Sequence, residues 1–336
     1  MAPADPSRAP GTAPVPTLVV PADPPAVLAE VVAREAEAAA AFARAEKAEA
    51  TRRAYRSDFG RFAAWCAARG AAALPAAPEA VAAFLASEAG AGAKPATLAR
   101  RVAAIRYAHR LAGHDPPTNA EAVRATLRGI RRTLGAAPAQ KAPATAARIA
   151  AMVALTPPDT LRGLRDRALL LLGFAGAFRR SELVALHVED LAETPDGLRV
   201  RIRRSKGDQE GSGQEVAVPH GARLRPVEAV RAWLDAAGIT EGPVFRRVNK
   251  GGRVGAEALT AEVVALVVRR YAERAGFRPE DFAGHSLRAG FLTSGAETGA
   301  NVFKLMEVSR HKSMDTLRGY VRRAELFKDH AGSGFH

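Results

Sequence analysis

Apolar residues recur every three or four positions along most of this chain, and that spacing limits the fold to one built mainly of helices. Tyr55, Phe59 and Phe62 follow one another at such steps near the start. Residues 198–203 differ, because apolar and basic side chains alternate there as they do in a half-buried strand. Residues 216–219 form a second apolar segment after a polar turn that contains glycine. We expect the two segments to pair as a β-hairpin.

The expected helices are spread over the whole chain. They cover residues 26–45, 51–69, 78–85, 97–110, 119–134, 145–156, 162–175, 179–186, 224–237, 259–276, 285–298, 302–310 and 314–326. Residues 1–25 are rich in proline and alanine, which is typical of a disordered tail. Residues 135–146 carry two prolines and no apolar periodicity, so we expect an interdomain linker there. A helical domain over 26–134 would then precede a mostly helical domain over 147–336, which holds the hairpin and ends in a tail.

The charge of the chain points to a polyanionic partner. The formal net charge is +14, and nucleic acid is the first candidate for so basic a protein. A membrane surface is the rival, but we find no apolar run of the about 18 residues that a spanning helix needs. The first residues do not match a secretory signal. The single cysteine, Cys66, excludes an intrachain disulfide and a thiolate metal cluster. We therefore expect a cytoplasmic, nucleoid-associated protein without membrane contact.

Two short stretches combine side chains that can bind a phosphate. Arg179 and Glu182 are three residues apart on one expected helix and share a face, and His285 and Arg288 do the same on another. Two arginines from different helices can clamp the oxygens of one phosphodiester and stabilise the charge that grows on it. The carboxylate of Glu182 can orient an arginine or a histidine. These residues are therefore candidate catalytic groups.

The remaining candidates complete a chemistry at phosphorus. Tyr320 can attack the phosphorus atom, and the resulting ester would conserve the energy of the broken bond, so no ATP is required. The arginines supply the electrostatic stabilisation, so we expect no metal or other cofactor either. His311 can donate a hydrogen bond to the phosphate. Lys206, near the tip of the hairpin, is the expected general acid, because an arginine keeps its proton. Lys250 is its rival and is more typical of a loop that contacts backbone phosphate.

Two groups of residues in the first domain are candidates for DNA binding. The start of the helix over 97–110 has a polar side suited to reading bases in the major groove, formed by Thr97, Arg100 and Arg101. The end of the helix over 119–134 is expected to contact phosphates, which position DNA without specifying its sequence, through Arg128, Arg131 and Arg132.

In this order the candidate residues resemble the tyrosine recombinase (phage integrase) family. Its pattern is an arginine in a Gly-Leu-Arg-x-Ser-Glu-Leu-like helix, a hairpin lysine, His-x-x-Arg, and Leu-Gly-His followed nine residues later by tyrosine. The matching positions are Arg179, Glu182, Lys206, His285, Arg288, His311 and Tyr320. The chain departs from the pattern twice. Ala177-Phe178 replaces Gly-Leu, and Ser309-Arg310 replaces Leu-Gly, so the loop before the histidine lacks a glycine that would ease a tight turn.

The resemblance covers residues 50–325. Within the family, the chain looks most like the Cre-type recombinases. It implies a two-domain clamp on duplex DNA, made of an all-helical core-binding domain and a mostly helical catalytic domain. It also implies a site-specific recombinase in which Tyr320 forms a 3′-phosphotyrosyl-DNA intermediate and strands exchange through a Holliday junction. The implied partners are double-stranded DNA with inverted-repeat core sites and further copies of the chain. The protein would be a monomer in solution and a tetramer on synapsed DNA.

Two other functions stay open on the sequence. A type IB topoisomerase or a telomere resolvase would use the same nucleophile and arginines. An assay for recombination between paired sites distinguishes a recombinase from a topoisomerase. A catalytically silent, sequence-specific DNA-binding protein is the second possibility, and the complete set of candidate residues argues against it.

Overall fold

The computed structural model describes most of the chain. The described residues are 31, 34–35, 37–38, 42, 46–135, 141–203, 213–311 and 313–324. They belong to two compact units, Met1–Ala137 and Pro138–His336, and the division falls within the expected linker. The expected tail over 1–25 and the hairpin turn with Lys206 lie outside the described residues. The described positions between 26 and 45 are helical.

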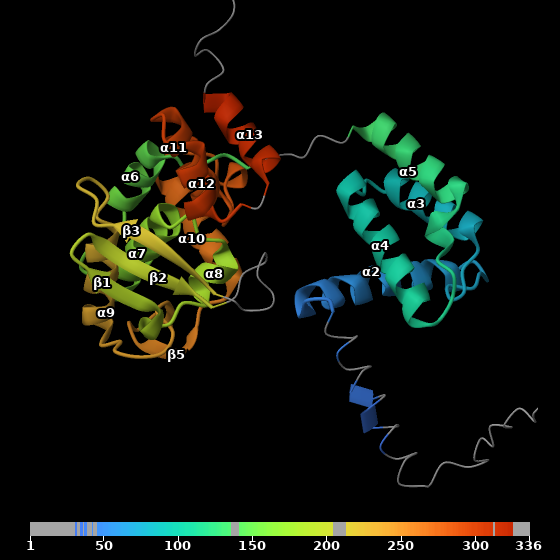
Figure 1. The fold of residues 1–336 in the computed structure, drawn as a ribbon, viewed down its shortest axis with the longest axis horizontal. Coiled ribbons are helices and arrows are strands. Elements are labelled where there is room, and N and C mark those ends of the chain that lie inside the picture. Colours follow the sequence, from blue (N-terminus) through green and yellow to red (C-terminus); the bar gives the residue numbers. More distant parts are fainter. Residues whose placement is uncertain are drawn as a thin grey trace, which may run out of the picture. The chain divides into compact units, whose positions relative to one another are not determined.

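The described part of the first unit is built of helices that pack in pairs (Figure 1). These are α2 (Glu49–Ala67), α3 (Pro78–Gly90), α4 (Pro95–Leu111) and α5 (Glu121–Leu134), with the 3₁₀ turn η1 (Pro117–Asn119) before α5. α2 packs against α4, and α3 packs against α5. Prolines open α3 and α4, where a missing backbone N–H breaks no helical hydrogen bond.

Aromatic and aliphatic side chains at helical spacing fill the core of this unit. Phe62, Phe84 and Ile105 have no exposed surface. The rings of Phe62 and Phe84 meet edge to face with centroids 5.1 Å apart. Burial of one such side chain stabilises a fold by about 1.5–3 kcal/mol. Cys66 is a free, fully buried cysteine in the same core, as a small apolar residue would be.

Charged side chains also lie inside the first unit, and they correct one prediction. Arg101 is only 8% exposed and donates to the carboxylate of Glu88, which also accepts from Arg61 Nε at 3.0 Å. Arg100 is half exposed, and its Nε donates to Asp58 at 2.6 Å. The placement of Arg101 on a polar side of its helix is therefore wrong. A buried guanidinium needs a charged partner, and α3 supplies one.

The second unit joins helices to two small antiparallel sheets (Figure 1). Its helices are α6 (Ala146–Ala154), α7 (Leu161–Ala175), α8 (Arg180–Val184), α9 (Pro226–Ala237), α10 (Ala261–Arg274), α11 (Ser286–Glu297), α12 (Val302–Ser309) and α13 (Met314–Ala324), with 3₁₀ turns η2 (Val188–Asp190) and η3 (Pro279–Asp281). Its strands are β1 (Leu191–Thr194), β2 (Gly197–Ile202), β3 (Gln214–Pro219), β4 (Arg246–Val248) and β5 (Val254–Ala258). The mainly α class is confirmed. None of the described helices is long and apolar enough to cross a membrane.

The expected hairpin is confirmed as β2 and β3. Val200 pairs with Val216, and Leu198 pairs with Val218. The apolar members of the alternation are buried, and the arginines between them are exposed. β1 pairs along the other edge of β2 and was not predicted from the sequence. It is only four residues long, which is too short for alternation to stand out.

α7 is the central helix of the second unit and leads directly to the site. Residues 169–172 are all at most 1% exposed, because α6, α9 and α11 pack around the helix. Thr160 caps its start, where the hydroxyl oxygen accepts from the backbone N–H of Gly163 at 3.1 Å. The last turn of α7 therefore forms a fixed base for the loop that carries Arg179.

Residues 141–145, part of the expected linker, pack against the start of α11. The backbone N–H of Ala142 donates to the carbonyl of Asp281 at 2.7 Å, and that of Ala144 donates to the carbonyl of Ser286 at 2.9 Å. Gly290 allows this approach, since a Cβ there would lie 1.8 Å from the carbonyl oxygen of Ala144. This contact fixes the helix that carries Arg288.

Candidate active site

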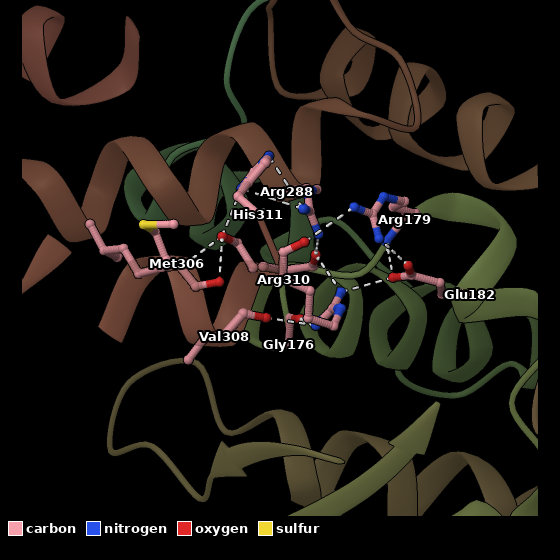
Figure 2. A network of polar contacts seen from close by, with 11 residues as sticks. Gly176, Arg179, Glu182, Arg288, Met306, Val308, Arg310 and His311 are labelled. Carbon is pink, nitrogen blue, oxygen red and sulfur yellow. Dashed lines mark hydrogen bonds and ion pairs between the residues drawn. The ribbon is translucent and has the colours of Figure 1, made fainter. Parts of the chain in front are cut away.

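Arg179 stands where the chain turns from α7 into α8. The preceding Ala177 has a left-handed backbone, with φ of 46°, and is fully buried. The backbone N–H of Arg179 donates to Glu182 Oε2 at 2.9 Å, and its Nη1 donates to Glu182 Oε1 at 2.5 Å (Figure 2). Glu182 therefore both caps the short helix and contacts the guanidinium of Arg179. The Arg179 side chain keeps 21% of its surface exposed.

Glu182 is a buried carboxylate between two guanidinium groups. Its side chain is 1% exposed. Burial alone would raise its pKa, but the charges of Arg310 and Arg179 and the backbone hydrogen bond from Arg179 outweigh burial and lower it. The group is therefore ionised at neutral pH.

Arg288 lies on α11 and is almost completely buried. Its Nη1 donates to the carbonyl oxygen of Ala177 at 2.9 Å, which joins α11 to the loop before α8. Burial, followed by the positive charges of Arg179 and Arg310, lowers the pKa of Arg288 to about 9. The side chain still carries its charge at neutral pH, and an anion bound beside it would relieve the repulsion.

His285 and Arg288 come from the same turn but lie at different depths. His285 is the N-cap of α11 and is exposed, whereas Arg288 is buried. The imidazole of His285 is near enough to His311 to contribute to the lowering of that residue's pKa. The two histidines and the two arginines of the sequence prediction therefore surround one site.

His311 follows the left-handed end of α12 and is neutral. Its Nδ1 lies 2.8 Å from the Ser309 hydroxyl, and its Nε2 lies 3.3 Å from Arg288 Nη2. Burial, followed by the charges of Arg288 and Arg179, lowers the pKa of His311 to about 4. The ring is therefore uncharged at neutral pH, and it can take part in hydrogen bonds without adding to the charge of the site.

Tyr320 lies on α13 at the edge of a small apolar cluster. It packs against Leu292, Leu305 and Leu317, which belong to α11, α12 and α13. Its phenol is close enough to Arg288 for the two to interact electrostatically. Packing of α13 on α11 thus brings the expected nucleophile beside Arg288.

The sequence did not predict a role for Arg310, which is the most connected side chain of the site. It is 4% exposed and donates to Glu182 Oε2 at 2.8 Å. It also donates to the carbonyl of Gly176 at 3.1 Å (Figure 2). A further bond reaches the carbonyl of Ala177 at 3.0 Å, and the guanidinium lies 5.2 Å from the ring centre of Phe178. The available signal was the replacement of Leu-Gly by Ser-Arg before the histidine.

The other candidates belong to other elements of the chain or to residues that the structure does not describe. Lys206 lies in the undescribed turn between β2 and β3. Lys250 is exposed in the turn between β4 and β5, which Asn249 closes by accepting from the N–H of Arg253 at 2.9 Å. Thr97 is partly buried at the start of α4. The basic end of α5 is exposed at Arg128, Arg131 and Arg132.

Comparison with known proteins gives matches in both units. Residues 145–326 match the phage integrase family, and residues 42–115 match the phage integrase N-terminal SAM-like domain. The integrase/recombinase xerD homolog of Selenomonas ruminantium is 40% identical, over 85% of this chain and 85% of that protein. The recombinase cre of Escherichia phage P1 is 23% identical, over 79% of this chain and 81% of that protein. These comparisons therefore do not confirm the assignment to the Cre-type subgroup.

Solved structures share the fold. The XerH site-specific recombinase bound to palindromic difH substrate matches with a TM-score of 0.56 at 19% identity, over 74% of this chain and 70% of that one. A lambda integrase dimer bound to a COC′ core site matches with a TM-score of 0.55 at 18% identity, over 83% and 73%. Together with the family match over more than half of its length, these findings show that the chain belongs to the phage integrase family and is a tyrosine-type site-specific recombinase.

Proposed function

We propose that the chain recombines DNA by a covalent mechanism in which Tyr320 attacks a scissile phosphate. The observation that supports this most is the meeting of Arg179, Arg288 and His311 next to the helix that carries Tyr320. Three elements distant in the sequence converge there on one positively charged site. Such a site suits a phosphodiester, whose negative charge grows in the transition state.

The two arginines would bind the non-bridging oxygens of the phosphate. Arg179 is partly exposed, and among the described residues its Nη2 makes one long contact of 3.5 Å, with the carbonyl of Arg310. Arg288 Nε is buried without a hydrogen-bond partner among the described residues. Both therefore keep N–H groups for an anion. The surrounding positive charge would also favour the phenolate form of Tyr320 as it attacks.

The chemical step exchanges one ester for another. The phenol oxygen of Tyr320 bonds to phosphorus, the bond from phosphorus to the 5′-oxygen breaks, and the 3′-phosphate stays on the tyrosine. The proton that the phenol loses would pass to the neutral ring of His311 as the new bond forms. Lys206 would give the leaving 5′-oxygen its proton. A 5′-hydroxyl of another strand can reverse the step, so no ATP is consumed.

The assembly that we propose follows from the relatives. The XerH complex holds a palindromic substrate, and the lambda integrase structure is a dimer on a core site. For this chain we propose duplex DNA with inverted-repeat core sites as the partner. Four copies would synapse two sites and exchange strands through a Holliday junction. The net charge of +14 and the exposed arginines of α5 support contact with a DNA backbone.

A trapping experiment tests this function. Duplexes that the full chain binds are selected from random sequence, and a nick is placed so that cleavage releases a short fragment and cannot be reversed. The wild-type chain should accumulate a covalent complex, visible as a shifted band in a denaturing gel. Tyr320→Phe should bind the same duplex with similar affinity and give no such band, because only the nucleophilic oxygen is lost.

Two results would contradict the proposal. Absence of a covalent complex with the wild-type chain on a duplex that it binds would leave a DNA-binding protein without catalysis. Relaxation of supercoiled DNA without any exchanged product on paired sites would favour a topoisomerase.

A further inference from the structure

Two residues with left-handed backbones meet at the centre of the site. Ala177 has φ of 46° and Arg310 has φ of 57°. Side chains rarely tolerate this region, and it persists where the surroundings hold it in place. The carbonyl of Ala177 accepts from Arg310 Nη2 at 3.0 Å, so each turn contributes to holding the other. Both positions depart from the glycine of the family pattern described above.

The Arg310 guanidinium has no terminal N–H group left for a phosphate. Its Nη1 donates to the carbonyls of Gly176 and Val308 at 3.1 and 2.6 Å. Its Nη2 donates to Ala177 and to Glu182 Oε2 at 2.8 Å. An arginine has four such terminal donors, and these contacts use all four. In its terminal nitrogens Arg310 therefore differs from Arg179 and Arg288 and acts on the protein itself, although its buried Nε, like that of Arg288, has no hydrogen-bond partner among the described residues.

The positive charge of Arg310 determines how much of the Glu182 negative charge Arg179 has to balance. Glu182 Oε1 accepts from Arg179, and Oε2 accepts from Arg310. Three guanidinium groups and one carboxylate give the buried cluster a net charge of +2, since His311 is neutral. Without the charge of Arg310, Glu182 would be countered by Arg179 alone, and the positive charge offered to a phosphate would fall by half.

We propose that Arg310 is a positioning residue of the active site, which neutralises Glu182 from the inside and thereby leaves Arg179 and Arg288 to bind the scissile phosphate. This inference rests on the proposed function. Ala177, Phe178 and Arg310 form one set, because the ring of Phe178 lies under the Arg310 guanidinium at 5.2 Å. The structure thus brings the two departures from the family pattern into direct contact.

The test compares covalent trapping in charge variants of the full chain. Arg310→Met keeps an unbranched apolar stem over Phe178 and removes the charge. It should slow formation of the covalent complex by on the order of 10²-fold, as misplaced phosphate-binding groups do. Its affinity for the duplex should change by less than about threefold, because phosphate contacts elsewhere dominate binding. Arg231→Ala, which breaks an exposed pair with Glu193, is the control and should match the wild type.

Repeating the test in the Glu182→Gln variant distinguishes the effect of the Arg310 charge from the effect of its packing. In Glu182→Gln there is no carboxylate to neutralise, so adding Arg310→Met should slow trapping by less than about tenfold. An equal loss in both backgrounds would show that Arg310 acts through its packing and its bonds to carbonyls rather than through Glu182, and it would overturn the proposal. Normal trapping by a folded Arg310→Met chain would do the same.

Two further comparisons keep the result interpretable. If Arg310→Met does not fold, Arg310→Lys replaces it. A lysine keeps the charge without the fork, so it should retain more of the trapping rate beside Glu182 than an uncharged residue. A loss with Arg310→Lys that persists undiminished in Glu182→Gln would overturn the proposal. If the wild-type chain itself forms no covalent complex, the proposed function fails first, and the role of Arg310 falls with it.

Discussion

At the scale of single residues, the site owes its chemistry to burial as much as to residue type. Arg288 on α11 is buried and His311 in the loop after α12 is partly buried, and both lie close to other positive charges. Burial makes the histidine neutral and leaves the arginine charged, because the arginine starts from a much higher pKa. The same environment thus yields one permanent cation and one uncharged hydrogen-bonding ring.

The pKa of His311 gives a prediction for pH. Its folded value is about 4, below the ordinary value of about 6.5. As the pH falls below about 6.5, the unfolded chain takes up this proton before the folded chain does, so the stability that neutral His311 contributes declines towards pH 4. A histidine-selective NMR titration of the DNA-free chain should show His311 unprotonated at pH 5.5. A midpoint near 6.5 would contradict the placement of the ring.

Residue-scale detail is also where the sequence predicted least. The order and spacing of arginine, histidine and tyrosine identified the catalytic candidates, since these depend on local chemistry. The inward turn of Arg101 depends on a carboxylate from another helix, and periodicity along one helix cannot show that. The role of Arg310 depends on a backbone angle and on carbonyls far earlier in the chain.

At the scale of elements, the fold fixes α11 by a close backbone contact at Gly290. Its hydrophobic spacing predicted a helix over 285–298, and the structure has Ser286–Glu297. The crossing of the extended segment before α6 was not predictable, because that segment has no periodicity of its own. The strands β4 and β5 escaped prediction for a similar reason, since they are three and five residues long.

Gly290→Ala tests how tightly α11 is held. The added Cβ would meet the Ala144 carbonyl at 1.8 Å, and backbone has to move to admit it. We expect the free energy of unfolding of the second unit to fall by about 1–3 kcal/mol, measured by urea denaturation. Gly319→Ala on α13 meets nothing within 4 Å and should be neutral or slightly stabilising. Equal stability of the two variants would show that the contact is loose.

At the scale of the whole molecule, charge and fold together indicate how the chain would engage DNA. A chain of net charge +14 that contacts many phosphates should lose affinity steeply with salt, by about 0.9 logarithmic units per phosphate for each tenfold rise in concentration. Arg131→Ala on α5 should reduce that slope by about one, whereas Arg231→Ala should leave it unchanged. Binding that hardly depends on salt would contradict a phosphate-dominated interface.

The carbonyl group of Ala177 accepts hydrogen bonds from two arginines of the site. A carbonyl oxygen has two lone pairs, and that of Ala177 receives Arg288 Nη1 at 2.9 Å and Arg310 Nη2 at 3.0 Å. With both lone pairs occupied, the peptide plane between residues 177 and 178 cannot rotate without breaking a buried bond. Arg288 is therefore anchored by a neutral dipole rather than by a carboxylate. Its position is fixed while its full charge stays available to an incoming anion.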